Sequence, residues 1–279
     1  MQLQETAYAK INLALHVRKR RDDGYHELET LFAFVDAGDE LTVEGAKTDR
    51  LTIIGEFAEG LPNGPDNLIL QALAQMRNMV LPGREPIPPL AITLDKRLPV
   101  AAGIGGGSAD AGAMIRLLDR HFVHNGDGKE LVLATHSLGA DVGACIISQT
   151  RIGMGLGWEL HMPAVNDLRD TPVLLVNPRL PLSTGPVFKQ WDGEDRGPLP
   201  SGSTKEIALS GRNDLEKPAI DLCLAIETVL TALKETQPIL ARMSGSGATC
   251  FALYGTVEER DAARTLMSGH WWTLAGKLR

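Results

Sequence analysis

The sequence predicts an α+β protein built from two domains. Period-two alternation of apolar and polar residues covers residues 7–17, which is typical of a strand with one apolar face. A strand, a glycine-rich loop and a helix follow over residues 91–123. A polar, proline-containing stretch at 159–171 then precedes a second series of helices and strands. We therefore expect one domain over residues 1–160 and another over residues 161–279.

The composition narrows the class of protein. A chain of 279 residues with 43% hydrophobic residues can bury the cores of two ordinary domains. The net charge of -7 argues against a protein that coats nucleic acid. The N-terminus lacks the basic start and apolar core of a signal peptide, and no apolar run approaches the roughly 18 residues of a membrane span. We expect a cytoplasmic protein without a nucleic-acid or membrane partner.

The cysteines and histidines indicate neither disulfides nor a structural metal. The three cysteines, Cys145, Cys223 and Cys250, are far apart and form no C-x-x-C pair. The seven histidines include no H-E-x-x-H or similar ligand spacing, so no metal ligand is assigned. A reducing compartment fits this pattern.

The first elements follow from alternation and from turn signals. On the strand at 7–17, Lys10 and Asn12 share the polar face, opposite the apolar side chains. Asp23-Gly24 predicts a turn back into a second strand. Strands are expected over 25–36, 40–44, 51–54 and 91–94, and a helix over 67–79.

The later elements alternate between helix and strand. Residues 191–205 are rich in glycine and proline and predict a long surface loop. A second glycine turn, residues 244–247, enters a strand that ends near residue 254. Helices are expected over 128–136, 214–234 and 257–268, and strands over 144–148, 151–156 and 171–177. The strands at 144–148 and 151–156 could pair with each other.

The glycine-rich loop at residues 99–110 carries the most information. Its four glycines allow positive φ angles and a close approach of backbone N–H groups to a ligand. Ser108 is expected to cap the following helix, with Asp110 in its first turn, so the helix would offer N–H groups and a positive dipole end to phosphate. The alternative is a flexible linker, which would not need a capped amphipathic helix after it.

Other known phosphate loops do not match this stretch. A Walker A loop would need a lysine after Gly107, and the dinucleotide pattern G-x-G-x-x-G fails at Ser108 and again at Asp110. The chain has no H-R-D or D-F-G pattern of protein kinases and no G-x-S-x-G elbow of hydrolases. The loop is therefore predicted to bind phosphate by another scheme.

Three further positions could carry chemistry, and each has a simpler alternative. Lys10 could point with Asn12 into one cleft, although a lone strand lysine is usually solvated. Asp141 lies among small and apolar residues, where a carboxylate is costly unless it is paired or functional; it could also form an Asx turn or cap a helix. The turn at 244–247 could supply a second set of N–H donors to an anion, or be only a tight turn before a strand.

Tyr25 and His26 follow the Asp-Gly turn. The tyrosine offers a stacking face, and the histidine offers a ring with two hydrogen-bonding edges. The alternative is that both are ordinary strand residues.

Three motifs, in this order, resemble those of the galactokinase, homoserine kinase, mevalonate kinase and phosphomevalonate kinase (GHMP) superfamily. They are residues 9–13 (Ala-Lys-Ile-Asn-Leu), 98–110 and 243–248. Within the superfamily, the chain most resembles the 4-diphosphocytidyl-2-C-methyl-D-erythritol kinase family, from about residue 6 to about residue 255. The pieces that favour this family are residues 23–28 (Asp-Gly-Tyr-His-Glu-Leu), 66–68, 139–142 and 211–215.

The resemblance implies a two-domain GHMP-kinase-like fold with the active site in the cleft between the domains. It implies transfer of the γ-phosphate of ATP to the 2-hydroxyl of a small cytidine-diphosphate-linked methylerythritol, in the non-mevalonate route to isoprenoids. Lys10 and Asp141 would be the catalytic pair: the carboxylate would accept the proton or orient the hydroxyl, and the lysine would stabilise developing charge. Mg²⁺ is expected with ATP, with Ser108 as a candidate ligand.

The resemblance also implies the binding residues. Tyr25 and Phe188 would stack on the cytosine, His26 would read its edge, and Asn12 would help to place the methylerythritol end. Asn67 and Lys96 would lie near the adenosine. The ATP phosphates would be wrapped by Pro99, Val100, Ala101, Ala102, Gly103, Ile104, Gly105, Gly106, Gly107, Ser108 and Ala109, with Ser244, Gly245, Ser246 and Gly247 as the second glycine turn.

Two departures from the family pattern are visible. Gly143 stands where a proline often follows Asp-Val, and the basic run at 18–21 is heavier than usual and is interpreted as a solvated turn. Another GHMP small-molecule kinase is the nearest alternative function, and Tyr25 and His26 argue against it. A nucleotide-binding sensor that has lost catalysis is the other, and the intact Lys10 and Asp141 argue against it.

Overall fold

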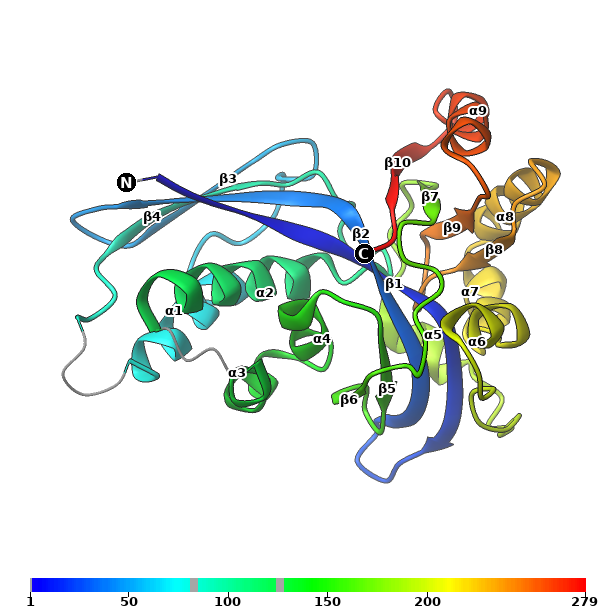
Figure 1. Ribbon diagram of the computed structural model, residues 1–279, viewed down its shortest axis with the longest axis horizontal. Helices are drawn as coiled ribbons and strands as arrows, with labels where there is room; N and C mark the ends of the chain where they lie inside the picture. Colours follow the sequence, from blue (N-terminus) through cyan, green and yellow to red (C-terminus); the bar gives the residue numbers. More distant parts are fainter. Residues whose placement is uncertain (1, 81–84, 124–127) are drawn as a thin grey trace. The chain divides into compact units, whose positions relative to one another are not determined.

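The computed structural model describes residues 2–80, 85–123 and 128–279 (Figure 1). The packing of these residues divides the chain into two compact units. Unit 1 draws on residues 1–9, 38–100 and 105–148, and unit 2 on residues 10–37, 101–104 and 149–279. The division is discontinuous in sequence, whereas the expected boundary between residues 160 and 161 is a single one; that boundary stays a prediction for the two sequence domains.

Two long strands supply residues to both units. Strand β1 (Gln2–Arg20) pairs with β2 (His26–Gly45). The strands expected at 25–36 and 40–44 are therefore one continuous strand, and the break between them was a wrong prediction. At Gly38 an added Cβ would lie 1.9 Å from the Ala7 carbonyl oxygen, so this glycine marks a close approach of β1 rather than a turn.

Unit 1 contains the first glycine loop's helix and a sheet edge. Strand β4 (Leu90–Asp95) pairs antiparallel with the end of β2 and parallel with β3 (Arg50–Ile54). The helices are α1 (Leu68–Asn78), α2 (Gly106–Leu118), α3 (Gly128–Thr135) and α4 (Val142–Ile147), with a π-helical turn at Asp119–Val123 and a 3₁₀ turn at His136–Leu138. Helix α2 packs against both α1 and α4.

The strand expected at 144–148 is wrong, because this segment is helix α4. Its apolar residues are buried against α2, where Gly112 leaves room: an added Cβ would lie 2.8 Å from the backbone of Cys145. A short apolar run has the same composition in a buried helix and in a buried strand, so periodicity could not separate the two.

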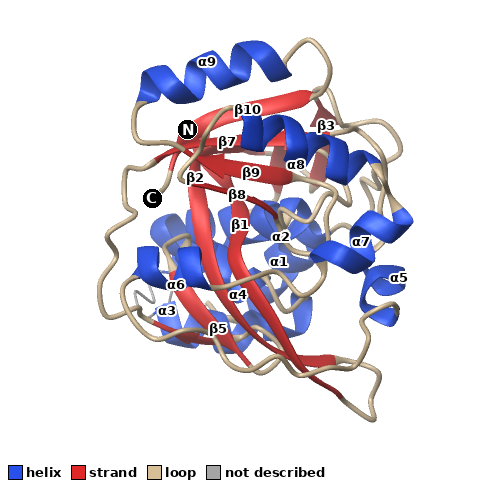
Figure 2. Cartoon of the chain, turned by 90° about the vertical axis from the view of Figure 1, so that its right-hand side faces the viewer, coloured by secondary structure: helices blue, strands red, loops and turns tan. Residues whose placement is uncertain are grey.

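Unit 2 contains an antiparallel sheet in the order β10-β7-β9-β8. Helix α8 (Ala225–Glu235) packs on β8 and β9, and α9 (Val257–Met267) packs on β7 and β10 (Figure 2). The sheet strands are β7 (Pro172–Asn177), β8 (Leu240–Met243), β9 (Cys250–Leu253) and β10 (Trp272–Lys277). The strand expected at 171–177 and the helix expected at 257–268 are both confirmed.

The remaining elements of unit 2 are short. Strand β5 (Arg151–Met154) pairs with β2 and with β6 (Glu159–His161), not with residues 144–148. The single helix expected at 214–234 is two helices, because Cys223 leaves helical geometry with φ -145° and ψ 86°. The other helices are α5 (Thr184–Lys189), α6 (Thr204–Ser210) and α7 (Glu216–Leu222). Among the described residues, no helix has both the length and the apolar character needed to span a bilayer.

Candidate active site

The glycine loop owes its shape to residues with left-handed backbone. Ala101, Gly103 and Gly105 have φ angles of 52°, 73° and 64°. Helix α2 begins directly after this bend, with Gly105 as its N-cap and no side-chain capping bond. The prediction that Ser108 caps the helix is therefore wrong: the left-handed Gly105 starts the helix earlier and places Ser108 inside its first turn.

The start of α2 leaves backbone donors at the loop. The Ala109 N–H donates to the Gly105 carbonyl at 2.7 Å, which closes the first turn. The N–H groups of residues 106–108 precede that bond and have no carbonyl partner within the helix. With the positive end of the helix dipole, they form the kind of site that binds phosphate.

A buried ion cluster supports this helix start from within unit 1. The Lys96 Nζ lies 2.6 Å from an oxygen of Asp39 and 2.6 Å from an oxygen of Asp110, and all three side chains are buried. The other Asp39 oxygen accepts from the N–H groups of Arg97 and Leu98, at 2.6 and 2.7 Å. The cluster thus ties β2 and the segment that enters the loop to α2.

The charges of this cluster are strongly coupled. Burial alone would lower the pKa of Lys96, but the two carboxylates raise it above its ordinary value. Burial raises the pKa of Asp110 to about 7 in spite of Lys96. Among the described residues, Asp110 Oδ1 is buried without a hydrogen-bond partner. Lys96, expected near the adenosine, therefore has its ammonium group committed to two carboxylates, and Asp110 is an internal residue.

Asn67, the other residue expected near the adenosine, caps helix α1. Its Oδ1 accepts from the Ile69 N–H at 2.9 Å, and its Nδ2 donates to the Pro62 carbonyl at 2.7 Å. The side chain is half-buried, so a contact of Asn67 with a nucleotide stays a prediction.

In unit 2, the second glycine turn contacts the middle of the first loop. The Ser244 Oγ donates to the Gly103 carbonyl at 2.9 Å and accepts from the Asn12 N–H at 3.1 Å. At Gly103 an added Cβ would lie only 2.4 Å from the Ser244 carbonyl oxygen, so the two turns can approach this closely only with glycine there. Two backbone bonds of 3.1 Å join the same segments, from Thr249 N–H to the Ala102 carbonyl and from Lys10 N–H to the Ile104 carbonyl.

Asn213 holds the second glycine turn from outside. Its Nδ2 donates to the carbonyls of Met243 and Gly245, both at 2.8 Å, while its Oδ1 accepts from the Leu215 N–H at 3.0 Å. Residues 211–215 were expected only to form a family motif, and this role of Asn213 was not predicted. An asparagine within a turn-forming stretch was the available signal, because its amide can bond backbone on two sides.

The polar face of β1 forms one hydrogen-bonded chain. The Lys10 Nζ donates to Asn12 Oδ1 at 2.9 Å, and Asn12 Nδ2 donates to Thr30 Oγ1 at 2.7 Å. Lys10 and Asn12 are 3% and 2% exposed, so the solvated-lysine alternative is wrong. The ammonium group also lies 5.4 Å from the centre of the Phe32 ring, a cation–π distance. Thr30, which fixes Asn12, was not predicted.

Asp141 stands at the start of α4 in unit 1, whereas Lys10 belongs to unit 2. It is half-buried, and it occupies the N-cap position with no side-chain capping bond. Asp141 thus caps the helix through its backbone, because its carbonyl accepts from the Cys145 N–H at 3.0 Å.

The structure brings His26 and Phe188 together. Their ring centres lie 5.0 Å apart with an angle of 39° between the ring planes. His26 is 8% exposed and Tyr25 is 64% exposed, so the tyrosine ring is open to a ligand at the surface. Trp191, which the sequence analysis did not single out, meets His26 edge-on, with ring centres 5.7 Å apart.

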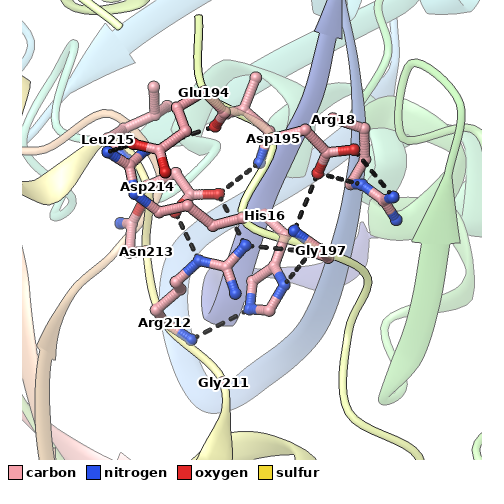
Figure 3. Close-up of polar contacts among 12 residues, drawn as sticks. His16, Arg18, Glu194, Asp195, Gly197, Gly211, Arg212, Asn213, Asp214 and Leu215 are labelled. Carbon is pink, nitrogen blue, oxygen red and sulfur yellow. Dashed lines mark hydrogen bonds and ion pairs between the residues drawn. The ribbon is translucent and has the colours of Figure 1, made fainter. Parts of the chain in front are cut away.

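His16 joins the β1 strand to the loop at 191–205 and to the motif at 211–215 (Figure 3). Its Nε2 accepts from the Arg212 N–H at 3.1 Å, so the neutral ring carries its proton on Nδ1, which donates to the Gly197 carbonyl at 3.1 Å. Asp214 accepts from the Val17 N–H at 2.8 Å and from the Arg212 Nε at 2.7 Å. Burial lowers the pKa of His16, and the charge of Arg212 lowers it further.

No group of three or more histidine, cysteine, aspartate or glutamate side chains with the spacing of a metal site occurs in the described part of the chain. Among the described residues, Cys145, Cys223 and Cys250 form no disulfide bond.

Comparisons with known families match two segments of the chain. The family described as GHMP kinases N terminal domain matches residues 67–149, and the family described as GHMP kinases C terminal matches residues 203–269. A 4-diphosphocytidyl-2-C-methyl-D-erythritol kinase from Novosphingobium aromaticivorans is 57% identical over 279 residues, covering 100% of this chain and 94% of that protein. The chain belongs to the 4-diphosphocytidyl-2-C-methyl-D-erythritol kinase family.

Further members of the family and of its superfamily agree. A 4-diphosphocytidyl-2-C-methyl-D-erythritol kinase from Sphingopyxis alaskensis is 54% identical over 281 residues, covering 99% of each chain. A crystal structure of a 4-(cytidine 5'-diphospho)-2C-methyl-D-erythritol kinase superposes with a TM-score of 0.80 at 29% identity, covering 99% of both chains. A homoserine kinase from Cytophaga hutchinsonii, at 14% identity and a TM-score of 0.69 over 99% and 95% of the chains, shares the fold. The expected α+β, two-domain GHMP kinase fold is confirmed.

Proposed function

We propose that this kinase-family chain phosphorylates the 2-hydroxyl of 4-diphosphocytidyl-2-C-methyl-D-erythritol with ATP, in the non-mevalonate route to isoprenoid precursors. One observation carries the proposal: the chain matches, from end to end at 57% identity, a protein that carries this enzyme's name. Solved structures of a homoserine kinase and a mevalonate kinase, at 14% and 13% identity, are similar to this chain in fold.

The glycine loop at residues 99–109 is proposed to hold the ATP phosphates. The free N–H groups at the start of α2 support this role, since oriented backbone donors and a helix dipole suit a polyanion. The bond from Ser244 to Gly103 supports a role for the second glycine turn, residues 244–247, in shaping the same loop.

Lys10 and Asp141 are proposed as the catalytic residues. The 2-hydroxyl oxygen attacks the γ-phosphorus, the bond to the ADP oxygen breaks, and the hydroxyl proton passes to the Asp141 carboxylate. The ammonium group of Lys10 stabilises the charge that develops on the phosphoryl oxygens. The bond from Lys10 to Asn12 supports this role by fixing the direction of the lysine side chain.

Tyr25, His26 and Phe188 are proposed to hold the cytosine, and Asn12 to help to place the methylerythritol end. The contact between His26 and Phe188, and the exposed ring of Tyr25, support a base site built from two aromatic faces and one polar edge. Asn67 and the Lys96 segment are proposed to lie near the adenosine.

Mg²⁺ and a cytoplasmic location belong to the proposal as well. Mg²⁺ usually keeps several of its water ligands and binds chiefly through the phosphates of a nucleotide, so its site does not require a cluster of acidic side chains. The hydroxyl of Ser108, in the first turn of α2, is a candidate ligand. When bound, the ion neutralises charge on the transferred phosphoryl group.

A panel of acceptors tests the function. The purified chain is incubated with ATP and either the cytidylyl methylerythritol, mevalonate, homoserine or galactose, and phosphorylated products are identified by mass and ³¹P NMR. The proposal expects a 2-phosphate of the cytidylyl compound and no comparable turnover of the others. Preferential phosphorylation of another acceptor, or ATP binding without turnover of any acceptor, would contradict it.

A further inference from the structure

Arg20, in the basic run expected to be a solvated turn, contacts the proposed cytosine site. The side chain lies at the surface, but its Nε donates to His26 Nε2 at 3.3 Å. Its Nη2 donates to the carbonyls of Trp191 and Lys189, at 3.2 and 3.4 Å. All of these residues belong to unit 2. Arg20 thus joins the end of β1 to His26 and to the segment that carries Phe188.

The bond from Arg20 decides which nitrogen of His26 carries the proton. A guanidinium group can only donate, so Nε2 must accept and the neutral ring must carry its hydrogen on Nδ1. Burial lowers the pKa of His26, and the charge of Arg20 lowers it further, so the ring is neutral near pH 7. Among the described residues, no protein atom accepts a hydrogen bond from Nδ1. This N–H therefore remains for a ligand.

Two aromatic neighbours restrict the His26 ring. Trp191 meets it at an angle of 83° and Phe188 at 39°, with ring centres 5.7 and 5.0 Å away. The residues His26 and Trp191 are 8% and 4% exposed. A ring held on two sides and bonded at Nε2 presents its remaining polar atom in one direction.

We propose that Arg20 is a specificity-determining positioning residue that fixes His26 as a hydrogen-bond donor to N3 of the cytosine. The proposal rests on the role of His26 in the proposed function. Cytosine N3 has a lone pair and accepts from Nδ1–H. Uracil carries a hydrogen on N3, so a uridylyl substrate would place two donors against each other and leave both unpaired. Without Arg20, the ring could move its proton to Nε2 and accept from uracil.

A substitution series tests this assignment. The kcat/KM of the parent and of Arg20→Met is measured for the cytidylyl substrate and for its uridylyl counterpart. We expect Arg20→Met to lower the cytidylyl-to-uridylyl ratio by about tenfold or more, chiefly through KM. Arg20→Lys, which keeps a donor and a charge, should restore part of the ratio. Equal losses for both substrates in Arg20→Met, with an unchanged ratio, would show a structural role only and overturn the proposal.

Arg18→Met is the matched control. Arg18 lies on the same strand and bonds Asp195 and Glu29, and no bond joins it to His26. Arg18→Met should leave the cytidylyl-to-uridylyl ratio of kcat/KM unchanged; a fall in this ratio that matches the fall in Arg20→Met would overturn the proposal. His26→Ala distinguishes the role of His26 from that of Arg20. If it leaves KM for the cytidylyl substrate unchanged, the base site of the proposed function fails; if KM rises but Arg20→Met keeps full discrimination, only the role of Arg20 fails.

A spectroscopic measurement on the parent protein tests the proposal even where the Arg20 variants fail to fold. Long-range ¹H–¹⁵N correlation of the parent protein reports the tautomer of each histidine, and the His26 signals are identified by their loss in His26→Ala. The proposal requires a neutral ring protonated at Nδ1. A ring protonated at Nε2 would overturn it.

Discussion

At the scale of single residues, the site depends on polar side chains that are buried and bonded to one another. Lys10, Asn12 and Thr30 lie on one face of β1 and β2 with their donors and acceptors matched. A buried ammonium group is tolerated only with such partners, and the same partners fix its direction. Lys10 therefore differs from an ordinary strand lysine, because it is buried and its ammonium group is hydrogen-bonded to Asn12.

Asp141→Asn tests the proposed general base. The amide keeps the shape of the side chain but cannot accept the hydroxyl proton, so we expect kcat to fall by about 10²–10⁴-fold. ATP affinity and the urea midpoint should stay near those of the parent. The measurement is steady-state ADP release, with ATP binding followed by calorimetry. Asp170→Asn, at an exposed residue, is the control; normal turnover by Asp141→Asn would remove the role of this carboxylate.

His16 predicts a pH dependence of stability. Its pKa is lowered in the folded state, so the unfolded chain binds a proton more readily between that lowered value and the ordinary 6.5. The free energy of unfolding should then fall as the pH drops below about 6.5, because a protonated Nε2 cannot accept from Arg212. Urea unfolding at several pH values checks this.

In the same series of pH values, His16→Gln should reduce the fall in the free energy of unfolding at low pH. His161→Gln, at an exposed position, should leave this fall as in the parent. An unchanged slope in His16→Gln would contradict the proposed bond pattern.

The sequence predicted that Lys10 and Asn12 share one face of a strand, and the hydrogen bond between their side chains agrees with this. Lys10 and Asn12 were marked by their places on the polar face of an alternating strand. Asp39 and Arg20 were missed, because each has a partner distant in sequence: Asp39 contacts Lys96, and Arg20 contacts Trp191. Single-sequence patterns carry no information about such pairs.

At the scale of elements, the start of α2 depends on glycine geometry rather than on a polar cap. Gly105 and Gly103 take left-handed conformations, and Gly103 fits beneath the second glycine turn. The expectation of a serine cap failed because sequence preference alone does not reveal φ. The strand at 40–44 was placed correctly but was separated from its neighbour, since a glycine in a strand and a glycine in a turn look alike in sequence.

Gly103→Ala tests the contact between the two turns. The added methyl group would meet the Ser244 carbonyl in a backbone conformation that alanine disfavours. We expect a loss of about 2 kcal/mol or more in the free energy of unfolding, and weaker ATP binding. Gly45→Ala is the control, because no atom lies within 4 Å of its added Cβ. Equal stability and ATP affinity in the two variants would contradict the described contact.

Lys96→Met tests the ion cluster that connects β2 with α2. Removing the ammonium group leaves Asp39 and Asp110 buried without their cation, so we expect the free energy of unfolding to fall by about 3–5 kcal/mol. The loss should be smaller at pH 5 than at pH 8, because burial already raises the pKa of Asp110, and without the Lys96 charge this carboxyl takes up a proton more readily in the folded state. Urea unfolding at both pH values measures it, with Lys47→Met at an exposed position as the control. A pH-independent loss would show that packing, not charge, holds the cluster.

At the scale of the whole molecule, the chain returns repeatedly to each of its two units. Strands β1 and β2 contribute to both, and residues 101–104 of the glycine loop belong to a different unit from the residues on either side. Local sequence patterns can place a boundary only between continuous segments, so they could not predict this division. Lys10 and Asp141 were predicted together because family motifs, unlike periodicity, carry information about residues far apart in sequence.

The release of ADP from ATP, with and without the cytidylyl methylerythritol acceptor, tests the central claim most directly. We expect rapid release that requires the acceptor, one ADP for each acceptor molecule phosphorylated, and loss of this release in Asp141→Asn. ADP release that does not depend on the acceptor, or ATP binding with no release in its presence, would contradict it.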